Sequence, residues 1–163
     1  MGLHDFLEWI QRSGLGHFMR ESGPWTYAIV NLLHILGVGS LFGAILILDL
    51  RLLGAWRRTP LAALADAAAS VAACGFALAA TSGIALFATK ATEYAGNPFL
   101  YIKFPAIAAG LINAWMLHLS PAWQARGTRD LSLRESRRLK WAGLTSLACW
   151  LTAITAGRMI AYW

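Results

Sequence analysis

Residues 25–53 read WTYAIVNLLHILGVGSLFGAILILDLRLL, and this run decides the fold of the chain. It exceeds the ~20 apolar residues that a helix needs to cross a hydrocarbon core about 30 Å thick. Further apolar runs cover about 64–89, 99–119 and 141–163. A segment in lipid must satisfy its own backbone hydrogen bonds, and none of the runs alternates as barrel strands do. We therefore expect four transmembrane α-helices.

The composition supports a single transmembrane domain over residues 1–163. The chain is 58% hydrophobic and 13% charged, whereas a soluble domain has about 45–50% apolar and about 25% charged residues. Proline, glycine and charged residues gather in the connections between the apolar runs. These features predict an all-α fold, an integral membrane four-helix bundle whose main partner is the lipid bilayer.

The first residues, MGLHDFLEWIQRSG, predict a short N-terminal helix at the membrane surface. Apolar residues recur there at helical spacing, with charged and polar residues between them. This pattern is typical of an amphipathic helix that lies in the interface. Asp5 and Glu8 stand where a signal peptide would have a basic region and an uninterrupted apolar core. We expect an interfacial amphipathic helix rather than a cleavable signal.

The net charge of +6 indicates topology rather than binding to nucleic acid, which we exclude. Nine of the fourteen Lys and Arg residues lie in two connections, and positively charged connections stay in the cytoplasm. We therefore expect a multi-pass protein of the bacterial inner membrane with both termini in the periplasm. Anionic lipid is a second possible ligand of these connections. The nine residues are Arg51, Arg57, Arg58, Arg126, Arg129, Arg134, Arg137, Arg138 and Lys140.

Four ionisable side chains inside the apolar runs suggest a functional site, because such groups are costly in lipid and mark function by default. His34 lies ~13 Å along the helix from Trp25, at ~1.5 Å per residue. With the predicted topology, Lys103 and Arg158 lie in the same outer half of the membrane. His118 ends the third run near the inner face.

A histidine in a membrane helix can bind haem iron or copper, relay protons, or serve as a structural hydrogen-bonding residue. Two cations at the depth of His34 favour haem, because Lys and Arg pair with carboxylates such as the haem propionates. The alternative for Lys103 and Arg158 is that their long stems carry the charges to the interface. The predicted cofactor site thus has His34 as an axial ligand and the two cations at the propionates.

The second axial ligand stays open. His34 and His118 differ in depth by roughly 15 Å, given the rise per residue, so they do not share one iron. His17 and Met159 are the candidates for the second ligand, or the position is vacant. His118 then serves a second, inner site or has a structural role.

The remaining polar residues of the runs predict structure. Cys74 and Cys149 have no CxxC pattern and are expected to be buried structural thiols. Asp49 and Arg51 are expected to form an ion pair or a helix cap. Small residues four apart on three of the runs predict close helix packing. They are Gly39 and Gly43, then Gly75, Ala79 and Gly83, and then Ala106, Gly110 and Ala114.

The run LLHILGVGSLFGAILILDLRLLG resembles the first haem-region helix of HemJ-type protoporphyrinogen oxidases and their CopD-like relatives, which carry a similar H-I-x-G … F-x-G … L … R-L pattern. The run FLYIKFPAIAAGLINAWMLH is similar to their later helix, with a lysine near its start. The chain length and the stretch from LFG to LDLRLLG resemble still more closely an uncharacterised family of small four-helix bacterial membrane proteins.

This resemblance implies a b-type haem on His34, with Lys103 as a further functional position. The leading hypothesis is a haem-b membrane protein in electron transfer, between a quinone and a periplasmic redox protein, or in an oxidase-like role. As an enzyme it would be a membrane oxidoreductase. The alternatives are a cofactor-free structural subunit of a larger membrane complex or homo-oligomer, and CopD-like metal transport. Transport needs several soft ligands, and the chain is poor in Cys, His and Met.

Overall fold

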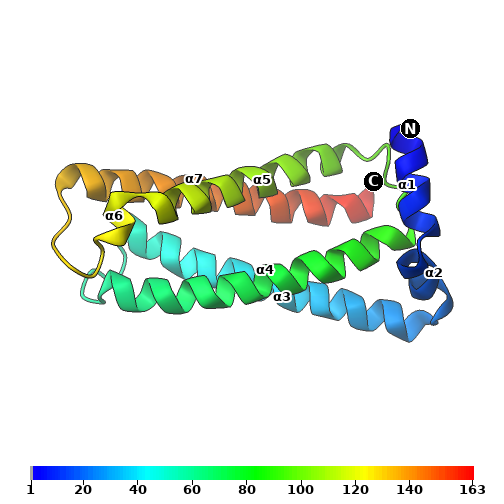
Figure 1. Cartoon of the computed structure of the whole chain (residues 1–163), viewed down its shortest axis with the longest axis horizontal. Helices are drawn as coiled ribbons and strands as arrows, with labels where there is room; N and C mark the ends of the chain where they lie inside the picture. Colours follow the sequence, from blue (N-terminus) through cyan, green and yellow to red (C-terminus); the bar gives the residue numbers. More distant parts are fainter. Residues whose placement is uncertain (1) are drawn as a thin grey trace. The chain divides into compact units, whose positions relative to one another are not determined.

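The computed structural model describes residues 2–163, which form helices and short connections and contain no strand. This confirms the predicted all-α fold. Figure 1 shows the helices in chain order. They are α1 (Leu3–Arg12), α2 (Gly14–Glu21), α3 (Pro24–Leu53), α4 (Leu61–Thr89), α5 (Pro98–Leu119), α6 (Pro121–Gln124), α7 (Leu133–Met159) and a terminal 3-10 turn, η1 (Ile160–Tyr162).

Four of the described helices are long and apolar enough to cross a membrane, namely α3, α4, α5 and the helix over Leu133–Tyr162. The protein is therefore a multi-pass membrane protein. Glycine and proline set several helix ends. Gly23 and Gly54 have φ of 83° and 115°, in the left-handed region that favours glycine at the end of a helix. Pro24 and Pro98 are the first residues of α3 and α5, where a missing N–H costs nothing.

The fourth long helix begins at Leu133, eight residues before the predicted start at Trp141. The physical reason is a capping box. The backbone N–H of Ser132 donates to the Glu135 carboxylate (2.9 Å), and the Glu135 N–H donates to the Ser132 hydroxyl (3.3 Å). Four of the basic residues ahead of the apolar run, Arg134, Arg137, Arg138 and Lys140, thus belong to the first turns of α7, whereas Arg126 and Arg129 precede it.

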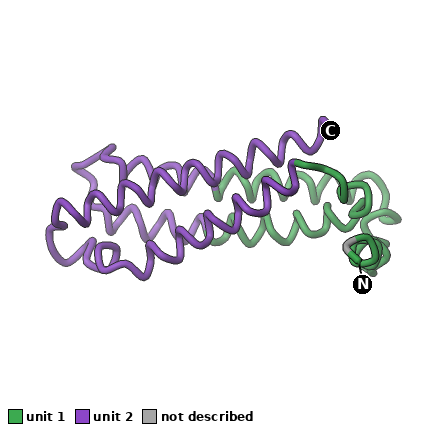
Figure 2. Tube along the Cα trace, turned by 90° about the horizontal axis from the view of Figure 1, so that it is seen from above, with its two compact units in different colours: residues 1–41, 73–98 green, residues 42–72, 99–163 purple. Residues whose placement is uncertain are grey.

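The chain divides into two compact units, drawn in two colours in Figure 2. Unit 1 is Met1–Leu41 with Ala73–Pro98, and unit 2 is Phe42–Ala72 with Phe99–Trp163. The helices α3 and α4 each contribute one part to unit 1 and another part to unit 2.

In unit 1, α3 and α4 touch backbone to backbone. A Cβ atom on Gly37 would lie 2.6 Å from the backbone nitrogen of Ala79, and one on Gly75 would lie 2.5 Å from that of Leu41. Gly39 and Gly43 had been expected to make such contacts, but that prediction is wrong, since a Cβ on either would meet nothing within 4 Å. On α3 the contacting glycine, Gly37, lies on another face, whereas Gly75 and Ala79 of α4 lie at the contact as expected.

Hydrogen bonds from side chains of α1 and α2 connect these two helices to the end of α4 and to the residues that follow it. The Oε1 atom of Gln11 accepts hydrogen bonds from the backbone N–H (3.0 Å) and hydroxyl (2.8 Å) of Thr92. Arg20 donates to the Gln11 carbonyl at 2.8 Å. Leu7 and Met19 are buried. Phe6 and Trp9 on α1 and Phe18 on α2 are exposed, and α1 also carries the Glu8–Arg12 ion pair. This mixture of apolar and charged side chains makes α1 amphipathic, as predicted for an interfacial segment.

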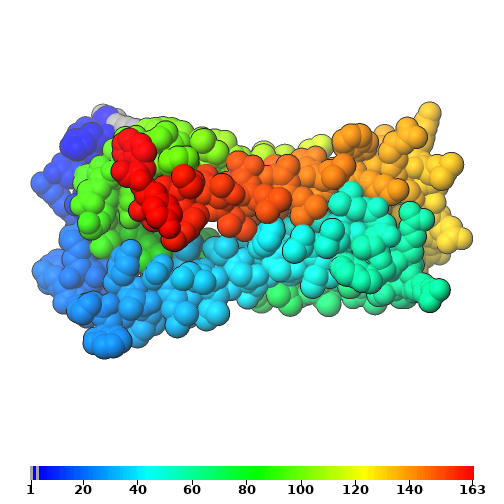
Figure 3. Space-filling view, turned by 180° about the vertical axis from the view of Figure 1, so that it is seen from behind, coloured from blue at the N-terminus to red at the C-terminus, as the bar shows by residue number. Residues whose placement is uncertain are grey.

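In unit 2, a hydrophobic cluster joins α3, α4, α6 and α7. Trp123 of α6 is 3% exposed, and the Arg126 guanidinium lies 4.5 Å above its ring. Arg126 also pairs with Asp66 of α4. Along α7, drawn orange to red in Figure 3, large apolar side chains such as Trp141 and Leu151 are exposed, as a lipid-facing helix requires. The buried cluster is Ala44, Leu48, Leu52, Ala65, Ala68, Ala122, Trp123 and Leu139.

Candidate functional site

His34 lies half-buried on α3 and is held by α4 within unit 1. Its Nδ1 atom is 2.9 Å from the carbonyl oxygen of Ala79 and 3.3 Å from the hydroxyl of Ser82. A carbonyl oxygen only accepts, so the bond to Ala79 places the proton on Nδ1. In the neutral ring, Nε2 is then the basic nitrogen.

Small residues of α4 make room for this imidazole. A Cβ on Gly83 would lie 3.0 Å from Cε1 of His34, so a larger residue there would press on the ring. Ser82 is buried and donates its own proton to the Leu78 carbonyl. The orientation of the His34 ring is therefore set by packing and hydrogen bonding to the neighbouring helix.

This arrangement suits a metal ligand. A histidine that binds a metal through one nitrogen commonly donates the other N–H to a carbonyl, which fixes the tautomer and raises the basicity of the ligating nitrogen. Ala79 supplies such a carbonyl, so the donor chemistry of His34 fits an axial ligand of haem iron. The same contacts suit a structural histidine, and the haem assignment stays a prediction.

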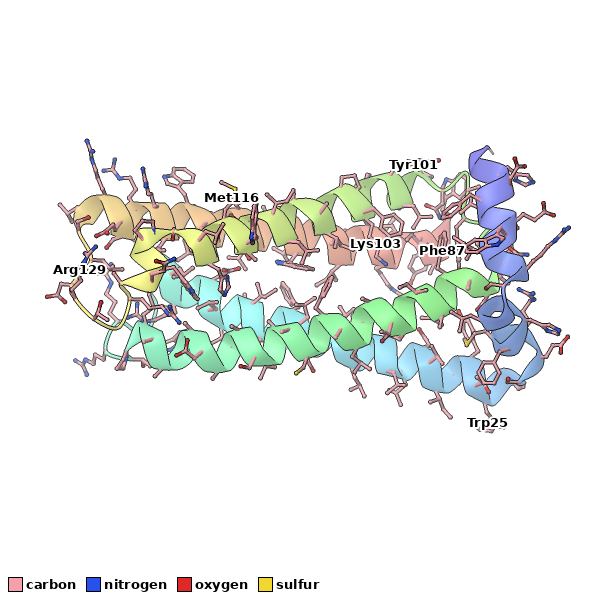
Figure 4. The ribbon with its side chains drawn as sticks, viewed as in Figure 1. Trp25, Phe87, Tyr101, Lys103, Met116 and Arg129 are labelled. Atoms are coloured by element: carbon pink, nitrogen blue, oxygen red, sulfur yellow. The ribbon has the colours of Figure 1, made fainter. Side chains whose placement is uncertain are left out.

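Lys103 and Gly157 meet in unit 2, where α5 passes α7. The Cε and Nζ atoms of Lys103 both lie 3.5 Å from the place where a Cβ on Gly157 would stand. Figure 4 labels this half-buried lysine on α5. Among residues 2–163 no carboxylate lies within ion-pair distance of its ammonium group. A glycine on α7 thus allows a lysine to lie against that helix without an acidic partner.

Arg158, the residue after Gly157, is exposed and turns toward the end of the chain. Its Nη2 atom donates to the Tyr162 hydroxyl at 2.5 Å, and its guanidinium carbon lies 4.8 Å from the centre of the Tyr162 ring. Lys103 and Arg158 belong to unit 2, whereas His34 belongs to unit 1. The predicted grouping of all three around one haem stays a prediction.

The candidate second ligands occupy different surroundings. His17 is exposed on α2, with Nδ1 3.1 Å from the Glu21 carboxylate. His118, at the end of α5, has Nδ1 2.8 Å from the carbonyl of Ala114 on its own helix, and its ring centre is 5.0 Å from that of Trp123. The ring contact between His118 and Trp123 links α5 to α6.

Met159, the remaining candidate, lines a groove of about 300 Å³ in unit 2. The groove runs between α5 and α7, and its wall is apolar except for two threonine hydroxyls. No group of three or more His, Cys, Asp or Glu side chains that could hold a metal ion occurs among the described residues. The groove is lined by Phe99, Ile102, Leu151, Thr152, Thr155, Ala156 and Met159.

Two polar positions differ from the sequence-based expectation. Asp49 is 3% exposed and has Ser146 of α7 as its hydrogen-bonding neighbour, while Arg51 donates from Nε to the Thr59 carbonyl at 3.0 Å. The sequence predicted that these two residues form an ion pair or a helix cap, and it did not predict the burial of the carboxylate.

Cys74, expected to be buried, is exposed, and Cys149 is half-buried; both are free thiols.

The fold and the polar residues within its spans define an α-helical multi-pass membrane protein. Residues 6–163 match a family model described as a family of unknown function (DUF6644). The chain belongs to this family, which agrees with the expected uncharacterised family, whereas no link to HemJ-type oxidases or CopD-like proteins is shown. Searches of curated proteins and of solved structures give no match to the chain.

Proposed function

We propose that this protein binds haem b in its membrane domain through His34 and acts in electron transfer or in an oxidase-like redox role. The observation that carries the proposal is the hydrogen bond from Nδ1 of His34 to the Ala79 carbonyl. It fixes the tautomer in which Nε2 is the basic, ligating nitrogen. A haem held there would supply one-electron chemistry at its iron.

The chain's own residues have three roles in this proposal. His34 ligates, Ser82 and Ala79 orient its ring, and Lys103 with Arg158 pairs with the propionates. Lys103 supports the propionate role because it is a half-buried cation with no carboxylate at ion-pair distance among the described residues. His17 and Met159 are the candidates for the second axial position, and His118 for a second haem.

The orientation belongs to the same proposal. The basic residues around the end of α3 and the start of α7 favour the cytoplasm for those ends, which would leave both termini in the periplasm of a bacterium. Electrons would then pass between a quinone in the membrane and a periplasmic redox protein.

The test is the absorption spectrum of the detergent-purified protein, oxidised and dithionite-reduced, with a pyridine haemochrome assay. We expect a b-type spectrum with one haem per chain, lost in His34→Ala and kept in His118→Ala. Two haems per chain would make His118 a ligand. A colourless wild-type protein, or full haem occupancy in His34→Ala, would contradict the proposal, and the colourless outcome favours the cofactor-free subunit.

A further inference from the structure

Asp49 is a buried carboxyl group with one oxygen atom that has no partner. The residue is 3% exposed, and its Oδ2 atom is fully buried without a hydrogen bond among the described residues. It lies near the end of α3 and faces α7. There the backbone of Gly143 packs against it, since a Cβ on Gly143 would lie 3.3 Å from the Asp49 carbonyl oxygen.

The polar surroundings of Asp49 within unit 2 consist of one hydroxyl group. Ser146, one turn after Gly143 on α7, is buried and is the hydrogen-bonding neighbour of the carboxyl. No charged side chain of the described residues forms an ion pair with Asp49. The titratable groups on the elements of unit 2 around Asp49 include Arg51 on α3, Asp66 on α4, Lys103 and His118 on α5, Arg126 after α6, and Cys149 with the exposed Arg137, Arg138 and Lys140 on α7.

Four of these groups bond to partners other than Asp49, and Lys103 lies against Gly157. Arg51 donates to the Thr59 carbonyl, Asp66 pairs with Arg126, and His118 bonds to Ala114 on its own helix. Lys140 is exposed, and Cys149 is a half-buried thiol. Asp49 therefore has no cationic side chain to balance a negative charge.

Moving a carboxylate from water into a protein interior without a cation beside it carries a large cost in desolvation free energy. A bound metal ion would remove this cost only with several oxygen ligands around it, and here the side-chain oxygen beside Asp49 is that of Ser146. A proton needs no further ligands. Binding of H⁺ to the carboxylate gives a neutral carboxylic acid, with no electron transfer and no leaving group.

We propose that Asp49 is a proton-binding site of the membrane domain, in which the carboxyl carries a proton at neutral pH and has Ser146 as its hydrogen-bond partner. Gly143 lets the backbone of α7 lie close to the backbone of α3 at Asp49. An ionisable group within a membrane span is the kind of site through which membrane proteins take up and release protons. This inference does not depend on haem binding at His34.

The experiment is infrared spectroscopy of the full-length protein in detergent at pH 7, with and without aspartate labelled with ¹³C at the side-chain carboxyl. We expect the C=O stretching band of a protonated carboxylic acid, shifted to lower frequency by the label. The band should vanish in Asp49→Asn and move to higher frequency in Ser146→Ala, because the hydrogen bond is lost. Asp66→Asn is the matched control, since Asp66 is exposed and paired with Arg126, and should leave the band unchanged.

The proposal is overturned if the labelled aspartates give carboxylate bands alone at pH 7, or if the acid band survives in Asp49→Asn. A variant that keeps Asp49 guards against failure of Asp49→Asn to fold. Replacing the exposed Asp5, Asp66 and Asp130 by asparagine leaves Asp49 as the one aspartate of the chain. The label-sensitive acid band must persist in that triple variant, and its disappearance would equally refute the assignment.

Discussion

The helix α3 carries His34 in unit 1 and Asp49 in unit 2, and these two residues differ in how far their hydrogen-bonding groups have partners. In unit 1, His34 lies against Gly83 and bonds to the Ala79 carbonyl of α4. In unit 2, Asp49 lies against Gly143 of α7 and keeps one oxygen without a partner. At both sites a glycine on the facing helix allows a close approach, to the His34 ring in one and to the Asp49 backbone in the other. The histidine has a backbone hydrogen-bond partner, whereas the Oδ2 atom of the aspartate has no partner.

The difference follows from what one helix can offer another. Inside a helix each N–H already donates to a carbonyl of the same helix, whereas each carbonyl oxygen keeps a second lone pair. A neighbouring helix therefore offers acceptors and few donors. His34 is a donor through Nδ1, and Asn113 likewise donates to the Ala142 carbonyl of α7 at 3.0 Å. An ionised Asp49 only accepts, so it needs a hydroxyl group or a proton of its own.

The largest expected effect tests the helix contact that positions His34. Gly75→Ala puts a Cβ atom 2.5 Å from the backbone nitrogen of Leu41 on α3, and a backbone atom cannot rotate away as a side chain can. Overpacking of this kind costs typically 1–3 kcal/mol and occasionally more, and we expect about 3 kcal/mol here. The measurement is unfolding of the purified protein in mixed detergent with added SDS, followed by circular dichroism.

Gly39→Ala is the matched control, because a Cβ there would meet nothing within 4 Å. Alanine is favoured over glycine inside a helix by roughly 0.5–1 kcal/mol, so the control should leave stability unchanged or raise it. Equal destabilisation by the two substitutions would show that the α3–α4 contact of unit 1 is not the close backbone contact described above.

A smaller effect is expected at the matching contact of unit 2. Gly143→Ala brings a Cβ to 3.3 Å from the Asp49 carbonyl oxygen and the Leu52 side chain, a distance that a shift of a few tenths of an ångström relieves. We expect a loss of about 1 kcal/mol, at the low end of overpacking costs, in the same unfolding assay. A loss as large as that of Gly75→Ala would mean that the contact around Asp49 is as rigid as the contact around His34.

Much of the fold could be predicted from the sequence, because four long apolar runs leave few alternatives to spanning helices. The start of α7 was predicted too late, although Ser132 and Glu135 have the spacing of a capping box and could have been recognised. Of the contacting glycines, Gly75 on α4 was predicted from its spacing, whereas Gly37 on α3 was not. A span that is apolar on all sides does not reveal which face meets a neighbour, so the spacing of Gly39 and Gly43 pointed to the wrong face.

The candidate site could be predicted only as a set of residues. The sequence singles out His34 as a costly group in a span, but its partners Ala79 and Ser82 lie on another helix and are ordinary residues in the sequence. Asp49 and Arg51 were predicted to form an ion pair or a helix cap at the end of the first span. Sequence proximity did not predict pairing, since residues two apart on a helix point to different sides.

The smallest effect is expected outside the spanning helices, where free backbone N–H groups can serve a side chain that accepts hydrogen bonds. Gln11 is an acceptor through Oε1, and it is satisfied because Thr92 lies in the connection after α4, where the backbone N–H is not used by a helix. Gln11→Ala removes both bonds, and we expect a local release of α1 worth about 1 kcal/mol. It would be measured as faster amide hydrogen exchange in α1 and at Thr92, with global unfolding almost unchanged.

Gln11→Glu keeps an acceptor in the same place and should retain slow exchange, because the Thr92 N–H and hydroxyl donate equally well to a carboxylate. If Gln11→Glu released α1 as fully as Gln11→Ala does, hydrogen bonds accepted by this side chain would not hold the helix. The different satisfaction of His34 and Asp49 would then not follow from a general shortage of donors.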